Sequence, residues 1–215
     1  MGVRFDFHFW MKEYEEDYHR DAGSKYPIFV DEKGVEHEET SPYFETMSAV
    51  LQKRGYLLKK EFVSIGKWKA ERQKGRYENN TDEKVERTTE KALRASYKDK
   101  IKILTRTRDK LKGVGIPVAS AILTVVYPKK YCIIDYRTWR ALLWLWKVAA
   151  KESFTFSSYR EYSDFLDSYD RYSTISTYFK FLGTLKDIGK KRNMTARQVE
   201  MALWKFDQMK GENIG

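Results

Sequence analysis

The sequence predicts an all-α protein. Signals for helix starts and ends recur along the 215 residues, and only four prolines interrupt them. Apolar residues follow helical spacing in several segments, whereas the alternation typical of strands is confined to short stretches. Hydrophobic residues make up 41% of the chain and aromatic residues 15%, which is enough for a packed interior. We therefore expect one domain, or two small lobes that share a core.

Two helices in the first half of the chain are predicted from capping residues. Ser41 followed by Pro42 is typical of a helix start, and Gly55 lies where that helix is expected to end. Thr81 predicts the start of a second helix, because threonine is a favoured N-cap. The face on which this helix is expected to pack consists of Val85, Thr89, Ala92 and Leu93.

The same signals predict helices later in the chain. Asp99 begins a helix with the helically spaced series Ile101, Leu104, Arg108 and Leu111. Pro117 predicts the opening of the next helix, since the first turn tolerates proline. Near the C-terminus, Thr195 and Gln198 form a capping box for a helix expected to end at Gly211.

Strand signals are short. Residues 3–9 alternate between apolar and polar, and residues 26–35 are predicted to form a small hairpin that turns around Gly34. Two polar segments of weak periodicity, 23–40 and 69–80, are predicted to be flexible loops.

The charge of the chain favours a polyanionic partner. Lys and Arg number 41 against 31 Asp and Glu, which gives a formal net charge of +10, and phosphate backbones are the usual partners of such proteins. Cys132 is the single cysteine, which excludes an internal disulfide and fits a cytoplasmic location. No apolar run approaches the ~20 residues of a membrane span, and the first residues show no signal-peptide pattern.

A Gly-Val-Gly hairpin is the most informative local feature. Gly113, Val114 and Gly115 must turn the chain between two predicted helices, and glycine lets a backbone approach a ligand closely. The helix that follows directs free N–H groups toward the same place, where an anion is favoured. We expect this hairpin to bind a nucleic-acid phosphate. The alternative is an ordinary helix corner in which the glycines act only as caps.

A carboxylate follows the hairpin at a fixed distance. Asp135 comes directly after the apolar run 132–134 and eighteen positions after Pro117. An acid near a bound nucleotide could stabilise the positive charge that develops on a sugar as its base departs. Asp135 also stands where a helix is expected to begin, so N-capping is the alternative role. The two roles are compatible.

Residues 111–142 resemble the helix-hairpin-helix DNA glycosylase superfamily. Its pattern is Leu-x-Gly-Val-Gly, a helix of small residues, an apolar run and an aspartate at the spacing of Asp135. The resemblance implies an all-α, helix-hairpin-helix glycosylase-like fold with two small helical lobes and a DNA cleft between them. The central lobe is expected to span 82–150, and the second lobe to combine 1–81 with 151–215.

The resemblance also implies the site and the reaction. Asp135 would be the catalytic carboxylate, and the phosphate-binding hairpin would consist of Lys112, Gly113, Val114, Gly115 and Pro117. Bifunctional relatives carry a Schiff-base lysine where this chain has Pro117, so we expect a monofunctional glycosylase without strand cleavage. No cofactor is expected beyond a monovalent cation at the hairpin. The single cysteine excludes the iron–sulfur cluster of some relatives, and the three histidines show no metal-ligand spacing.

Aromatic and basic residues outside the motif are candidates for the base pocket. Trp68 with Lys69 and Arg72 forms a basic-aromatic cluster suited to stacking and phosphate contacts, and Trp139 lies one helical turn after Asp135. Each tryptophan has core packing as its alternative role, and the charges could be a solvated loop.

The expected function is excision of a damaged or modified base from double-stranded DNA by a monomeric enzyme. The base would be flipped out of the stack and its N-glycosidic bond hydrolysed, leaving an abasic site. Base excision repair and defence against phage DNA with modified bases both fit this activity. A non-catalytic helix-hairpin-helix protein that binds DNA or scaffolds a repair complex is the alternative.

Overall fold

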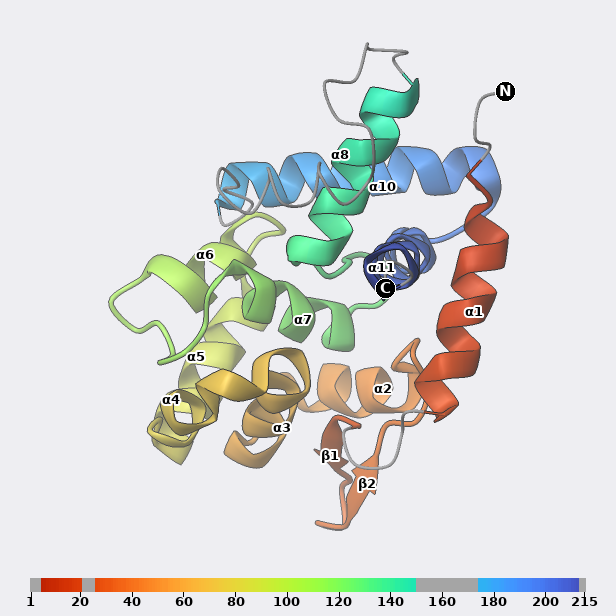
Figure 1. The fold of residues 1–215 in the computed structure, drawn as a ribbon. Coiled ribbons are helices and arrows are strands. Elements are labelled where there is room, and N and C mark those ends of the chain that lie inside the picture. The colour runs from red at the N-terminus through yellow and green to blue at the C-terminus, as the bar shows by residue number, and fades with distance from the viewer. Residues whose placement is uncertain (1–4, 21–25, 150–173, 213–215) are drawn as a thin grey trace. The chain divides into compact units, whose positions relative to one another are not determined.

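The computed structural model describes residues 5–20, 26–149 and 174–212. Within these ranges the protein is mostly helical, with one two-stranded sheet, as the sequence predicts (Figure 1). The elements in chain order are α1 (Phe7–Arg20), β1 (Ile28–Val30), β2 (Glu36–Glu38), α2 (Glu45–Arg54), α3 (Lys59–Ala70), the 3-10 turn η1 (Glu71–Gln73), α4 (Lys74–Glu78), α5 (Asp82–Arg94), α6 (Asp99–Arg106), α7 (Ile116–Val126), α8 (Tyr136–Ala149), α10 (Ile175–Arg192) and α11 (Ala196–Glu212).

The chain divides into two compact units. Unit 1 consists of residues 1–17 and 134–215, and unit 2 consists of residues 18–133. These boundaries differ from those of the predicted lobes, 82–150 and 1–81 with 151–215. The segment from the second predicted helix to the hairpin therefore belongs with the residues before it, in unit 2.

Helix α7 forms the centre of unit 2. From Val118 to Val126 every residue of this helix is buried, and it packs against α2, α3 and α6 (Figure 1). The C-terminal carbonyl of Val126 accepts hydrogen bonds from Ser48 Oγ at 2.9 Å and Gln52 Nε2 at 2.6 Å. A helix that is apolar on all faces is expected to be buried, and Ser120 is the one polar residue between Val118 and Leu123. Its hydroxyl donates to Pro117 O within the same helix.

The small sheet of unit 2 confirms the predicted hairpin. Strands β1 and β2 pair in antiparallel fashion, with Phe29 opposite His37. Gly34 has a φ of +80° in the connecting turn, and Asp31 Oδ1 accepts the N–H groups of Lys33 and Val35 at 2.9 Å each. The turn is thus made by a glycine and an aspartate that satisfies backbone donors.

Helix α2 begins three residues later than Pro42 suggests. Its N-cap is Phe44, and the carboxylate of Glu39 accepts the N–H of Met47 at 2.7 Å. Glu39, which precedes the predicted helix start, therefore satisfies a backbone N–H of the first turn of α2, and Ser41 does not act as the N-cap. The expected end is confirmed, because Gly55 has a φ of +81° and its N–H bonds to Leu51 O at 2.9 Å.

Helix α5 agrees with the sequence prediction at both its start and its buried face. Thr81 Oγ1 accepts the N–H of Lys84 at 3.3 Å. The four residues predicted to form the packing face are all buried: Val85, Thr89, Ala92 and Leu93. Helix α6 begins at Asp99 as expected but ends at Arg106, so the prediction that Arg108 and Leu111 continue it is wrong.

The prediction that residues 69–80 form a flexible loop is also wrong, because this segment contains η1 and α4. Tyr77 has no exposed surface and Asn80 is 2% exposed. A segment that looks polar in sequence therefore contributes two buried side chains to unit 2.

Unit 1 is built on the packing of α8 against α11 and of α10 against α11 (Figure 1). Thr195 and Gln198 form the predicted capping box, with Thr195 N–H donating to Gln198 Oε1 at 2.7 Å and Gln198 N–H donating to Thr195 Oγ1 at 3.2 Å. The expected end at Gly211 is wrong, since α11 continues to Glu212. The alternating pattern in residues 3–9 does not form a strand where it is described, because α1 begins at Phe7.

Candidate functional site

The hairpin of unit 2 is a tight turn that leads directly into α7. The N–H of Val114 donates to Leu111 O at 3.3 Å, and Gly113 has a φ of +83°. Such a turn needs a residue that adopts the left-handed region at its third position, and glycine does so without strain. Gly115 then has an extended backbone and caps α7, whose first helical bond runs from Ala119 N–H to Gly115 O at 2.9 Å.

Tyr77 explains why the turn has no side chain at Gly113. A Cβ added at Gly113 would meet the ring of Tyr77 at 2.7 Å, and one added at Gly66 in α3 would meet the same ring at 2.8 Å. The ring is therefore enclosed between two glycines from different segments. Its hydroxyl donates to Ala70 O at 3.2 Å, and burial raises the pKa of this phenol above its ordinary value.

The side chain of Asn80 fixes the backbone of the hairpin through hydrogen bonds to Lys112. Its Oδ1 accepts the N–H of Lys112 at 2.8 Å, and its Nδ2 donates to Lys112 O at 3.2 Å. The same Nδ2 group also reaches Tyr77 O at 2.9 Å and Arg76 O at 3.1 Å. One buried amide thus holds both polar groups of the residue that precedes Gly113, which makes the hairpin a rigid part of unit 2.

Gly115 differs from Gly113 because the fold does not require it to be glycine. It is exposed, its φ is −97°, and the nearest neighbour of an added Cβ would be Pro117 Cδ at 3.8 Å. An ordinary side chain would therefore fit. Because Gly115 has no side chain, the backbone at the start of α7 is accessible, beside the exposed Lys112. The N–H groups of a first helical turn have no partner within the helix. Val114 is buried, and Pro117 is partly exposed.

Asp135 begins α8 in unit 1 and takes part in a reciprocal cap. Its Oδ1 accepts the N–H of Thr138 at 2.9 Å, while its own N–H donates to Thr138 Oγ1 at 3.0 Å. Thr138 is fully buried and Asp135 is partly exposed. The predicted capping role is therefore confirmed, and the cap fixes the orientation of the carboxylate at the surface of the helix start.

Unit 1, to which Asp135 belongs, contains a buried ionic pair. Arg197 of α11 is 1% exposed and pairs with Glu200, and its Nη2 donates to the hydroxyl of Tyr14 at 3.3 Å. Burial raises the pKa of Tyr14, and the negative charges of Glu200 and Asp135 add to that rise. The carboxylate of Asp135 is thus within electrostatic reach of a tyrosine and arginine pair that is closed off from water.

The hairpin and Asp135 belong to different units of the chain. The structure brings Asp135 together with Thr138, and its charge acts on Tyr14; it brings the hairpin together with Tyr77 and Asn80. Sequence reasoning missed these supporting residues because none of them lies in the motif. The expected approach of the carboxylate to the phosphate-binding turn stays a prediction.

The candidate base-pocket residues also divide between the units. Trp68 in α3 of unit 2 is partly buried and packs edge-on against Phe44, with ring centroids 5.4 Å apart. Lys69 is partly exposed and Arg72 is exposed in η1. Trp139 belongs to α8 in unit 1, and its ring lies 6.3 Å from that of Phe181 in α10. Both tryptophans therefore make the core contacts that were their alternative role.

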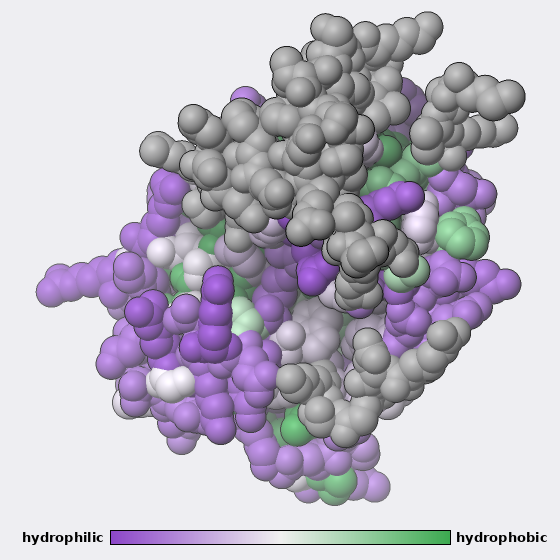
Figure 2. All heavy atoms as spheres, in the orientation of Figure 1, coloured by the Kyte–Doolittle hydropathy of each residue, from purple (hydrophilic) through white to green (hydrophobic). Residues whose placement is uncertain are grey.

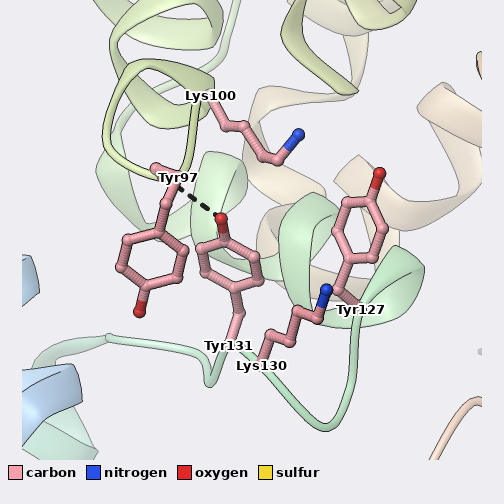
Figure 3. A pocket seen from close by; sticks show the side chains of 5 residues that line it. All are labelled: Tyr97, Lys100, Tyr127, Lys130 and Tyr131. Carbon is pink, nitrogen blue, oxygen red and sulfur yellow. Dashed lines mark hydrogen bonds between the residues drawn. The ribbon is translucent and has the colours of Figure 1, made fainter. Parts of the chain in front are cut away.

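A pocket that sequence reasoning did not identify lies in unit 2. Figure 3 shows its lining side chains, which come from α6 with the turn before it and from the loop that follows α7. Its volume is about 230 Å³, and its lining consists of Tyr97, Lys100, Tyr127, Lys130 and Tyr131. The three tyrosines lie just before α6 or just after α7, outside the apolar repeats that predict these helices. No local pattern in the sequence therefore indicates that their side chains meet.

The described residues contain no cluster of three His, Cys, Asp or Glu side chains suited to a metal ion. A cation at the hairpin would need carbonyl oxygens. Those of Leu111, Lys112 and Gly115 accept hydrogen bonds from Val114, Asn80 and Ala119, and each oxygen has a second lone pair. The expected monovalent cation stays a prediction. No helix in the described ranges is long and apolar enough to cross a membrane.

Comparisons with known proteins give no further assignment. No model of a known protein family matches the chain, and no curated protein and no solved structure shows a significant similarity to it.

Proposed function

We propose that the protein is a monofunctional DNA glycosylase that removes a damaged or modified base from double-stranded DNA and leaves an abasic site. The proposal rests on Asp135, a partly exposed carboxylate that a reciprocal cap with Thr138 holds at the start of α8. It stands at the spacing from Pro117 that the resembling family gives to its catalytic aspartate. Repair of damaged DNA and defence against modified viral DNA would use the same reaction.

The role of Asp135 follows from the charge of the reaction. Positive charge develops on the deoxyribose as the base departs, and a nearby carboxylate stabilises that charge and orients the attacking water. Because Thr138 N–H occupies Oδ1, the carboxylate has little freedom to rotate. An acid held in this way loses less entropy in the transition state than a mobile one would.

The hairpin supplies the DNA contact in this proposal. An exposed Gly115, an exposed Lys112 and the first turn of α7 together offer backbone donors and a positive charge to a phosphate. Pro117 has no amine, so a Schiff base cannot form at the position where bifunctional enzymes carry a lysine. The expected product is therefore an abasic site without strand cleavage.

The substitution Asp135→Asn tests the proposed chemistry. Asparagine caps helices about as well as aspartate, so α8 should keep its start while the carboxylate charge is lost. Mass spectrometry of free bases released from a panel of damaged and phage-derived DNAs identifies the substrate of the unmodified protein. On that substrate, Asp135→Asn should slow base release by at least about a hundredfold and leave DNA affinity unchanged.

A matched control is Asp82→Asn, which changes an exposed carboxylate in the first turn of α5. It should release bases at the rate of the unmodified protein. If Asp135→Asn is as active as Asp82→Asn, the carboxylate of Asp135 is not catalytic and the proposed mechanism is wrong.

A non-catalytic DNA-binding protein is the second candidate, and one observation favours it. Tyr77 and Asn80, which both belong to unit 2, hold the hairpin, so a phosphate contact there does not require Asp135. Under this hypothesis the DNA panel would yield no free base, while binding would still depend on Gly115. If the unmodified protein releases a base and Asp135→Asn does not, the non-catalytic hypothesis is excluded.

A further inference from the structure

The pocket of unit 2 combines two ammonium groups with three aromatic rings. Figure 3 shows the side chains of Lys100 and Lys130 directed toward the space beside the ring of Tyr127. The distances from the two Nζ atoms to the centre of that ring are 5.2 and 5.8 Å. The pocket is open at the surface, since Lys130 is exposed and Tyr97 is 39% exposed.

Positive charge in this pocket has no carboxylate partner among the described residues. Lys100 Nζ donates to the carbonyl of Leu93 and, at 3.5 Å, to that of Ala92, which satisfies hydrogen bonds but does not neutralise the charge. Burial lowers the pKa of Lys100, and repulsion from Lys130 lowers it further. Two like charges beside one ring therefore leave a position at which an anion would relieve repulsion.

The aromatic side of the pocket is rigid. The rings of Tyr97 and Tyr131 are stacked, with centroids 5.1 Å apart and planes 23° from parallel. The hydroxyl of Tyr131 donates to Tyr97 O at 3.1 Å, and that of Tyr127 donates to Leu93 O at 3.3 Å. Because both hydroxyl groups are bonded to backbone, the rings are held in place before any ligand arrives, which lowers the entropic cost of stacking.

We propose that this pocket binds one nucleotide unit, with its phosphate between the ammonium groups of Lys100 and Lys130 and its base against the tyrosine rings. A nucleotide carries an anion and a planar π system a few ångströms apart, which is the combination that the lining side chains offer. Aromatic side chains stack on bases with little sequence preference, and lysine contacts phosphate as a point charge.

The size of the pocket restricts the ligand. A volume of about 230 Å³ is below the range of roughly 300–1,000 Å³ typical of sites that enclose a drug-sized molecule. The nucleotide is therefore only partly enclosed, either as a free mononucleotide or as one unit of a single strand that runs across the surface. The site lies wholly in unit 2 and requires no glycosylase reaction.

The test is a binding titration of the purified full chain, in which the NMR signals of the tyrosine rings are measured after each addition of a probe. The probes are deoxyadenosine 5′-monophosphate, deoxyadenosine, inorganic phosphate and a short single-stranded oligodeoxynucleotide. We expect Lys130→Gln to weaken binding of the nucleotide probe about tenfold, the loss typical of one charge-assisted contact. Lys129→Gln is the matched control, because Lys129 is exposed, adjacent in sequence, of equal charge and outside the pocket lining.

Each outcome decides the proposal. Saturable binding of the mononucleotide that falls in Lys130→Gln but not in Lys129→Gln supports a free nucleotide as the ligand, and the same pattern for the oligonucleotide alone supports a strand. Equal losses in the two variants would show general attraction to a basic surface and overturn the proposal. Binding of deoxyadenosine or of inorganic phosphate as tight as that of the nucleotide would also overturn it, as would the absence of saturable binding by either nucleotide probe.

Discussion

Two glycines separated by one residue have different physical reasons to be glycine. Gly113 has a φ of +83° and no room for a Cβ beside the ring of Tyr77, whereas Gly115 has an extended backbone and an added Cβ would meet nothing closer than Pro117 Cδ at 3.8 Å. The fold explains the first glycine completely. For the second, the proposed approach of a phosphate to the backbone would supply a reason.

This difference gives a prediction for a pair of alanine variants. Gly113→Ala should lower the free energy of unfolding by about 2–4 kcal/mol, because it adds backbone strain and a clash with Tyr77. Gly115→Ala should change it by less than about 0.5 kcal/mol yet weaken DNA binding, since its Cβ would occupy the space a phosphate needs. Denaturant unfolding and a DNA titration measure the two effects. Unchanged DNA affinity in Gly115→Ala would contradict a phosphate contact at this residue.

Among the elements, those whose boundaries depend on nearby residues could be predicted from sequence. Helix α5 begins at Thr81 because that hydroxyl satisfies Lys84 N–H three residues on, and such a signal is present in the sequence itself. Helix α4 was missed because it has five residues, and its stability comes from Tyr77 enclosed between two distant glycines. The start of α2 likewise depends on a residue outside the helix, because the carboxylate of Glu39 accepts the N–H of Met47.

The candidate site was predictable to a similar extent. The motif identifies Gly113 and Asp135, and a local cap explains the position of Asp135. Asn80 and Arg197 could not be found, since an amide in a polar segment and an arginine in a helix have no distinctive local pattern. Their importance arises only when tertiary packing buries them.

The pairing of α8 with α11 gives a prediction at the level of elements. Asp207 of α11 is fully buried, and Arg140 of α8 binds it through Nε and Nη2, each 2.6 Å from a carboxylate oxygen. Arg140→Met should lower the free energy of unfolding by about 3 kcal/mol, because it removes the closest charge partner of a buried carboxylate. The loss is at the low end of the usual range since Arg137 remains 3.7 Å from Asp207.

Denaturant unfolding of single and double variants measures this interaction. Arg140→Met combined with Asp207→Leu should recover most of the lost stability, because an apolar pair can replace a buried ion pair. The control is Lys53→Met, which breaks the exposed pair with Glu32 and should cost less than about 1 kcal/mol. A double variant no more stable than Arg140→Met alone would show that the arginine stabilises the helices by packing and not by pairing.

For the whole molecule, the surface is largely charged, whereas several phenol groups are buried. Figure 2 shows that the described residues on the visible face are mostly hydrophilic, in keeping with a net charge of +10. Four tyrosines in the interior or near it have raised pKa values, with burial as the largest cause: Tyr14, Tyr77, Tyr127 and Tyr131. Three of them belong to unit 2.

These tyrosines predict a loss of stability in alkaline solution. Their unfolded pKa is about 10, and the folded values are higher, so their contribution is complete below pH 10. Above it the unfolded chain releases protons that the folded chain retains, and the free energy of unfolding falls as the pH rises. Lys100 acts in the opposite direction, because its folded pKa is below the ordinary value. It offsets part of the loss at the lower end of this pH range.

Denaturant unfolding between about pH 8 and 12, with tyrosinate absorbance recorded in parallel, measures this effect. Tyr131→Phe is the informative variant, because it removes a titrating hydroxyl that donates to Tyr97 O while it keeps the buried ring. Its stability should fall less steeply with pH than that of the unmodified chain, whatever its stability at neutral pH. Equal slopes would mean that the hydroxyl of Tyr131 does not contribute to the loss of stability in alkaline solution.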